Sequence, residues 1–90
     1  MTRVVFVGPH GALAAALHGG VFAGPAPAEA VAEAIEELDA PLPARVDATA
    51  PGDRVVDTAI WNLPDPVGLC LEEVRELRAV IEQRVASLPR

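Results

Sequence analysis

The sequence predicts one α/β domain: a small, mainly parallel sheet of three to four strands with helices on both faces, forming a three-layer sandwich. Two observations lead to this prediction. Strand-like and helix-like segments alternate along the chain with short connections, an order typical of parallel sheets. The final segment repeats apolar side chains every three or four residues, which indicates a helix with one buried face.

The first half of the chain predicts two strands joined by a helix. Residues 3–7, Arg3 followed by an apolar, mostly β-branched run, are too short for a helix and are stopped by Gly8-Pro9, so they indicate a buried strand. Residues 11–17 are rich in Ala and Leu, and a glycine pair after them is a typical helix stop. Residues 21–23 then give a brief second strand before the Gly-Pro turn at 24–27.

The middle of the chain is expected to supply a second helix and the rest of the sheet. Residues 28–39 place apolar side chains on one face and glutamates on the other, as an amphipathic helix requires. Residues 45–47 are short enough for an edge strand. The β-branched run 53–61 is expected to be one long strand or two shorter pieces.

Residues 71–88 predict the last helix, which we expect to pack along the sheet. Cys70 falls at the N-cap position and Glu73 at the third helical position, as in a capping box. Arg78 and Glu82 are spaced for an exposed ion pair on the same helix.

Size and composition limit the core and the partners. The 90 residues allow one domain, whose core must be thin because 51% of the residues are hydrophobic but only 3% are aromatic. Seven basic and thirteen acidic side chains give a net charge of −6, which disfavours binding to nucleic acid or anionic membranes. We therefore expect a protein partner or a homodimer.

Cysteine and histidine usage indicates a reduced, metal-free protein. A single cysteine excludes an internal disulfide, and two histidines leave little for a metal site, so neither metal nor cofactor is expected. The cytoplasm is the expected compartment. A signal peptide is the alternative because Arg3 precedes an apolar run, but the break at residues 8–11 disfavours it.

One motif carries a family resemblance. The segment Trp61-Asn62-Leu63-Pro64-Asp65-Pro66, between an apolar run and a helix, resembles the acid loop after the last strand of the low-molecular-weight protein tyrosine phosphatase and arsenate reductase family. Residues 68–75 resemble the loop and closing helix that follow, and residues 21–27 resemble the second strand and its turn. The resemblance implies that residues 1–90 are a truncated form of that fold, with Asp65 matching the general acid.

The same resemblance implies a missing active site. The family needs a cysteine nucleophile, an anion-binding arginine and a hydroxyl residue after the first strand, whereas Gly8, Ala14 and Ala15 stand at those positions here. The segment between Pro43 and Ile60 is also too short for the family's middle elements. The leading hypothesis is therefore a non-catalytic binding or regulatory protein.

Two alternatives stay open. The chain is a small enzyme with altered chemistry if Asp65, Cys70 and His10 converge, or a small-ligand binding domain if the loop from Gly8 to Gly11 forms its site. These five residues are thus the candidate ligand-binding positions. For three of them a structural role competes: a solvated loop residue for His10, a turn residue for Asp65 and a helix cap for Cys70.

Overall fold

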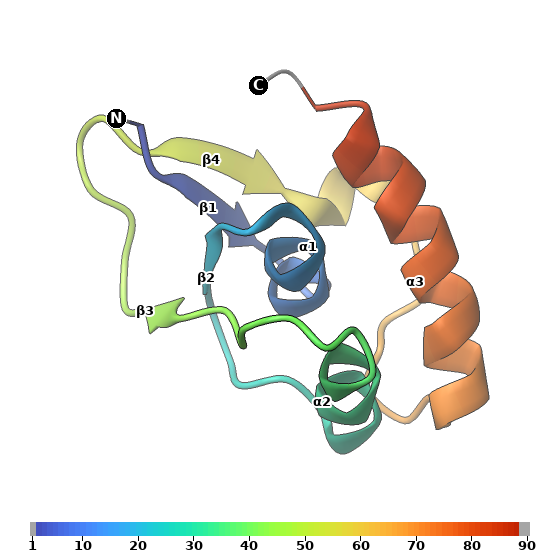
Figure 1. Ribbon diagram of the computed structural model, residues 1–90. Coiled ribbons are helices and arrows are strands. Elements are labelled where there is room, and N and C mark those ends of the chain that lie inside the picture. The colour runs from blue at the N-terminus through green and yellow to red at the C-terminus, as the bar shows by residue number, and fades with distance from the viewer. Residues whose placement is uncertain (1, 89–90) are drawn as a thin grey trace.

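The computed structural model describes residues 2–88 and confirms a small α/β sandwich built on a parallel sheet. The strands run in the order β3-β2-β1-β4, all parallel, so the first strand lies at the centre (Figure 1). The elements in chain order are β1 (Val4–Val7), α1 (Gly11–His18), β2 (Val21–Ala23), α2 (Glu29–Glu36), β3 (Arg45–Val46), β4 (Arg54–Asp57), the 3₁₀ helix η1 (Thr58–Trp61) and α3 (Leu71–Ala86).

The three helices lie on one side of the sheet, whereas we expected helices on both faces. α1 contacts both α2 and α3, and α2 contacts α3, which a sheet between them would prevent. Figure 1 shows the same grouping. One core includes Phe6 and Phe22 of the sheet, Leu13 of α1, Ile35 of α2 and Ile81 of α3. The right-handedness of parallel crossovers explains why α1 and α2 share this layer, because β1, β2 and β3 succeed one another in one direction; α3 follows β4 and lies in no crossover.

The opposite face of the sheet is crossed by a strand connection and not by a helix. Residues 47–53 lead from β3 at one edge to β4 at the other, and Figure 1 shows them running on the side away from the helices. Val5 points to this face, since side chains alternate along a strand and Phe6 belongs to the core. Val5 is nevertheless fully buried, whereas its neighbour Val55 on the edge strand is 49% exposed.

The run 53–61 was expected to lie in the sheet, as one strand or two pieces, but only Arg54–Asp57 is a strand and Thr58–Trp61 form a 3₁₀ helix. β4 ends at Asp57, whose carboxylate accepts a hydrogen bond from the Ala59 N–H at 2.9 Å and caps η1. Trp61, the last residue of η1, packs partly buried against the core. The chain therefore leaves the sheet after Asp57, which is the register partner of Val7 at the end of β1.

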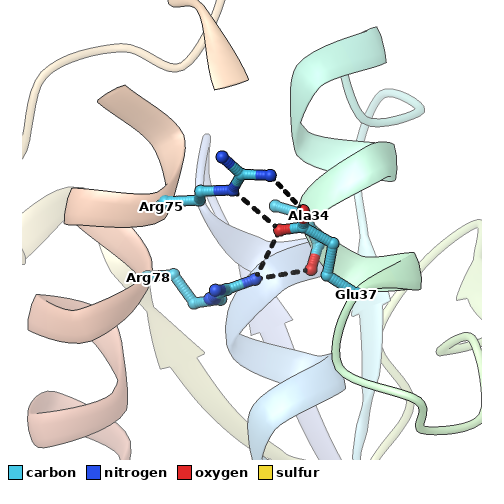
Figure 2. A network of polar contacts seen from close by, with 4 residues as sticks. All are labelled: Ala34, Glu37, Arg75 and Arg78. Carbon is cyan, nitrogen blue, oxygen red and sulfur yellow. Dashed lines mark hydrogen bonds and ion pairs between the residues drawn. The ribbon is translucent and has the colours of Figure 1, made fainter. Parts of the chain in front are cut away.

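α3 begins at the expected residue, but its Arg78 forms its ion pair with another helix and not within α3. Glu73 accepts the Cys70 N–H at 3.1 Å, which is one half of a capping box. Arg78 reaches across to α2, where it donates to the Ala34 carbonyl at 3.0 Å and to Glu37 at 3.1 Å, and not to Glu82 on its own helix (Figure 2). Arg75 forms a bidentate pair with the same glutamate.

No helix in residues 2–88 is long and apolar enough to cross a membrane.

Candidate functional site

A pocket of about 150 Å³ opens where β1 and β2 end. Such carboxyl ends of parallel strands are where open α/β sheets bind ligands. Apolar atoms line most of it, and Asp65 is its one ionisable residue. The lining residues are Gly8, Pro9, Ala12, Phe22, Pro25, Ala26, Pro27, Ala28, Val31, Asp65, Pro66 and Val67.

The turn between β1 and α1 uses its own backbone donors. The Gly11 N–H donates to the Gly8 carbonyl at 3.1 Å, and the His10 N–H donates to Thr58 Oγ1 at 3.2 Å. Pro9 has no N–H to offer. A loop that binds phosphate or arsenate needs several backbone N–H groups aimed at the anion, and residues 9–11 of this turn offer none, because Pro9 has no N–H and those of His10 and Gly11 are engaged.

Two glycines are required by close packing at this turn. Gly8 has φ of +95°, and a Cβ there would lie 2.6 Å from Thr58 Oγ1. A Cβ on Gly11 would lie 2.8 Å from the Phe6 carbonyl oxygen. Of these two candidate residues, Gly8 lines the pocket, whereas Gly11, the first residue of α1, is buried and does not.

His10 is a buried structural residue and not the solvated loop residue expected. Its side chain is packed inward, with the whole residue 3% exposed. Because the Pro64 carbonyl can only accept, the imidazole Nε2–H donates to it at 2.8 Å. Burial lowers the pKa of His10 and outweighs the opposing effects of that carbonyl and of nearby Asp65. His10 therefore ties the first turn to the acid-loop motif as a neutral side chain.

Asp65 has the turn geometry expected for it and also faces the pocket. Its Oδ1 accepts the Val67 N–H at 2.9 Å, which is an Asx turn. The residue is exposed and lines the pocket beside Pro66. It thus supplies a negative charge at the rim of an otherwise apolar surface.

Cys70 lies outside the pocket, as the exposed N-cap of α3. The structure therefore brings Gly8 and Asp65 to one pocket with His10 behind them, and does not bring Cys70 there. Within residues 2–88, no three His, Cys, Asp or Glu side chains gather as a metal site.

The two alanines at the family's arginine and hydroxyl positions belong to the core. Ala14 and Ala15 are fully buried within α1, which has already begun at Gly11. The turn between β1 and α1 has only three residues, 8–10. An alignment with the longer loop of the resembled family therefore needs a gap at this turn. Neither alanine lies at the pocket surface.

Sequence reasoning missed two parts of this site. Thr58 is fully buried, donating to the Val7 carbonyl at 2.8 Å while accepting from His10, but its β-branched side chain suggested only a strand. Residues 25–28 form one wall of the pocket. Their proline content, beside a strand end, was the signal that could have located this wall.

Comparisons with protein-family models, with curated proteins and with solved structures give no match. The likeness to the low-molecular-weight phosphatase and arsenate reductase family therefore depends on the sequence motifs alone, above all on residues 61–66, and stays a prediction.

Proposed function

We propose that this chain is a non-catalytic binding module, similar in fold to low-molecular-weight phosphatases, that holds one side chain of a protein partner in the pocket beside Gly8 and Asp65. One observation carries the proposal. The turn where the family would hold an oxyanion is closed by its own hydrogen bonds, and the pocket next to it is apolar with a single carboxylate.

Size and charge favour a cationic, partly apolar occupant. The volume of about 150 Å³ is well below the roughly 300 Å³ at which small-molecule pockets begin, so one side chain fits better than a cofactor. Asp65 attracts a positive charge, and the net charge of −6 adds to this attraction while repelling phosphate or arsenate. A lysine-like group, with an aliphatic stem and an ammonium end, has the matching chemistry.

The enzyme alternative has less support. His10 Nε2–H is engaged by the Pro64 carbonyl, and Cys70 does not line the pocket. Without a nucleophile beside it, Asp65 has no leaving group to protonate. We therefore predict no hydrolysis of aryl phosphates and no reduction of arsenate.

Butylammonium is a suitable probe for the proposed occupant. Titrated into isotope-labelled protein, it should shift the amide resonances of Ala12, Val31 and Val67, whereas phosphate, arsenate and sulfate should shift none of the amides of the first turn. Asp65→Asn keeps the oxygen that accepts the Val67 N–H, so the pocket should retain its shape. This variant should weaken butylammonium binding and leave binding of neutral butanol unchanged.

Two results would contradict the proposal. One is a set of oxyanion-induced shifts in residues 8–13. The other is turnover of an aryl phosphate that Asp65→Asn abolishes.

A further inference from the structure

β4 is the unprotected edge of the sheet. β3, at the opposite edge, has only two residues and follows Pro41 and Pro43, and short strands and prolines are typical protections of a sheet edge. β4 has four residues, no proline and no partner strand on its outer side within residues 2–88. Figure 1 shows it at the margin of the molecule.

Backbone geometry determines which groups β4 offers outward. The Arg54 N–H donates to the Arg3 carbonyl at 2.8 Å, so the polar groups of Arg54 face β1. Because these groups alternate along a strand, the N–H and C=O of Val55 and the N–H of Asp57 face outward, whereas the Asp57 carbonyl belongs to the first turn of η1. The outer edge of β4 therefore presents two donors, the N–H groups of Val55 and Asp57, and one acceptor, the Val55 carbonyl, to another strand.

A row of valines ends at this edge. Val21, Val5 and Val55 are register partners on β2, β1 and β4, and they share the sheet face opposite the helices. Val5 is fully buried but Val55 is 49% exposed, because nothing on the outer side of β4 covers it. A strand that placed an apolar residue opposite Val55 would continue the row.

We propose that β4 pairs antiparallel with β4 of a second copy, about a two-fold axis perpendicular to the sheet that passes beside Val55. An antiparallel pair about such an axis sets one residue opposite itself, and Val55 is the outward-facing apolar residue of the strand. The two Val55 residues would then exchange two N–H···O=C bonds. The row of three valines would become a row of six across an eight-stranded sheet.

Charges at the ends of the paired segment are compatible with a second copy, because one of the two facing carboxylates already has a cationic partner. In this register Asp57 lies opposite Asp53 of the other copy. Asp53 is already neutralised by Arg3, whose guanidinium donates to both carboxylate oxygens at 3.0 and 2.7 Å. The same ion pair holds the pKa of Asp53 below its usual value.

Disulfide trapping tests the register directly. A hydrogen-bonded antiparallel pair has its Cα atoms about 5.5 Å apart, within the roughly 4.4–6.8 Å span of a disulfide. In a Cys70→Ser background, Val55→Cys should cross-link to a dimer at least about tenfold faster than Ile60→Cys under the same oxidant. Ile60 is the matched control because it is 72% exposed yet outside the strand.

Sedimentation of the unmodified chain tests the association itself. Since a small interface gives a transient complex, the average mass should rise from 9.4 kDa towards twice that value between about 10 µM and about 1 mM. Val55→Lys should raise the dimer dissociation constant at least about tenfold, and Val80→Lys, on the 39% exposed Val80 of α3, should leave it unchanged.

A monomer at every concentration would overturn the proposal. So would equal cross-linking at Val55 and Ile60, or equal weakening by the two lysine variants. These measurements are independent of the pocket, so their failure leaves the proposed side-chain binding standing.

Discussion

At the scale of the residue, Gly8 determines what the first turn can hold. Its φ of +95°, and the 2.6 Å that would separate a Cβ from Thr58 Oγ1, exclude every side chain without rearrangement. A cysteine placed there would meet the same obstruction. A single Gly8→Cys substitution would therefore not restore the nucleophile of the resembled family, because neither the backbone conformation nor the space beside Thr58 accommodates a side chain at residue 8.

Gly8→Ala should destabilise the fold by more than the strain of a left-handed residue alone. That strain costs roughly 1–2 kcal/mol, and the contact with Thr58 adds to it. Gly52→Ala is the matched control, since Gly52 has φ of +90° with no atom within 4 Å of its Cβ position. Urea unfolding of both variants measures the difference, and an equal loss of free energy of unfolding would show that Thr58 yields at no cost.

At the scale of the element, His10 joins two segments that are distant in the sequence. The turn after β1 and the segment after η1 meet through the imidazole and the Pro64 carbonyl, and Thr58 adds a second connection beneath them. The pocket lies on these same two segments. The shape of the pocket therefore depends on the hydrogen bonds of His10 and Thr58.

The free energy of unfolding should fall as the pH drops below about 6.5. Burial lowers the pKa of His10 from its usual 6.5, so the unfolded chain takes up a proton before the folded chain does. Above pH 6.5 the titration of His10 thus leaves the free energy of unfolding unchanged. Below pH 6.5 it lowers this free energy increasingly until the pH passes the pKa of His10 in the folded protein. Chemical unfolding between about pH 7.5 and 5 checks this.

Two variants separate His10 from the rest of the molecule. His10→Gln removes the titrating group and should flatten the pH dependence in this range, and His18→Gln keeps His10 and should retain it. A flat profile in the unmodified chain would show that protonated His10 is accommodated.

The elements were predictable from the sequence to a greater extent than the contacts between them. Residues 71–88 have an apolar period that only a helix satisfies, and α3 lies there. The single layer of helices was not predictable, because local patterns do not reveal that β3 follows β2 outward. The burial of His10 was not predictable either. Its hydrogen-bond partner is the backbone carbonyl of Pro64, which is far along the chain, and a backbone carbonyl cannot be recognised from residue type.

At the scale of the whole molecule, the carboxylate of Glu37 connects α2 to α3. Glu37 at the end of α2 accepts from Arg75 and Arg78 of α3, and Arg78 also satisfies the Ala34 carbonyl near that helix end (Figure 2). Hydrogen bonds from Arg75, followed by those from Arg78, lower the pKa of Glu37 to about 2. α2 and α3 are thereby held in one relative position above α1.

Acid should weaken this junction in a defined range. Because the pKa of Glu37 is lowered from 4.5 to about 2 in the folded protein, its contribution is complete above pH 4.5 and is lost as the pH falls towards 2. Glu37→Gln should therefore lower the melting temperature at pH 6 and have a smaller effect near pH 2. High salt should reduce the difference, since the pair is solvent-accessible.

Glu36→Gln is the control for this junction, because Glu36 is an exposed neighbour outside the contacts of Figure 2. Differential scanning calorimetry of the two variants gives the comparison. Equal melting temperatures at pH 6 would mean that the junction adds nothing to stability.

The central position of β1 also constrains how this chain is made. β1 is synthesised before its neighbour β4, which follows some fifty residues later, and α3, which supplies Val74, Ile81 and Val85 to the same core, is made later still. A nascent chain that stops before residue 71 leaves Phe6 and Leu13 without that cover. Folding of this domain should therefore wait until α3 has been synthesised, and the apolar segments that precede it are exposed to chaperones until then.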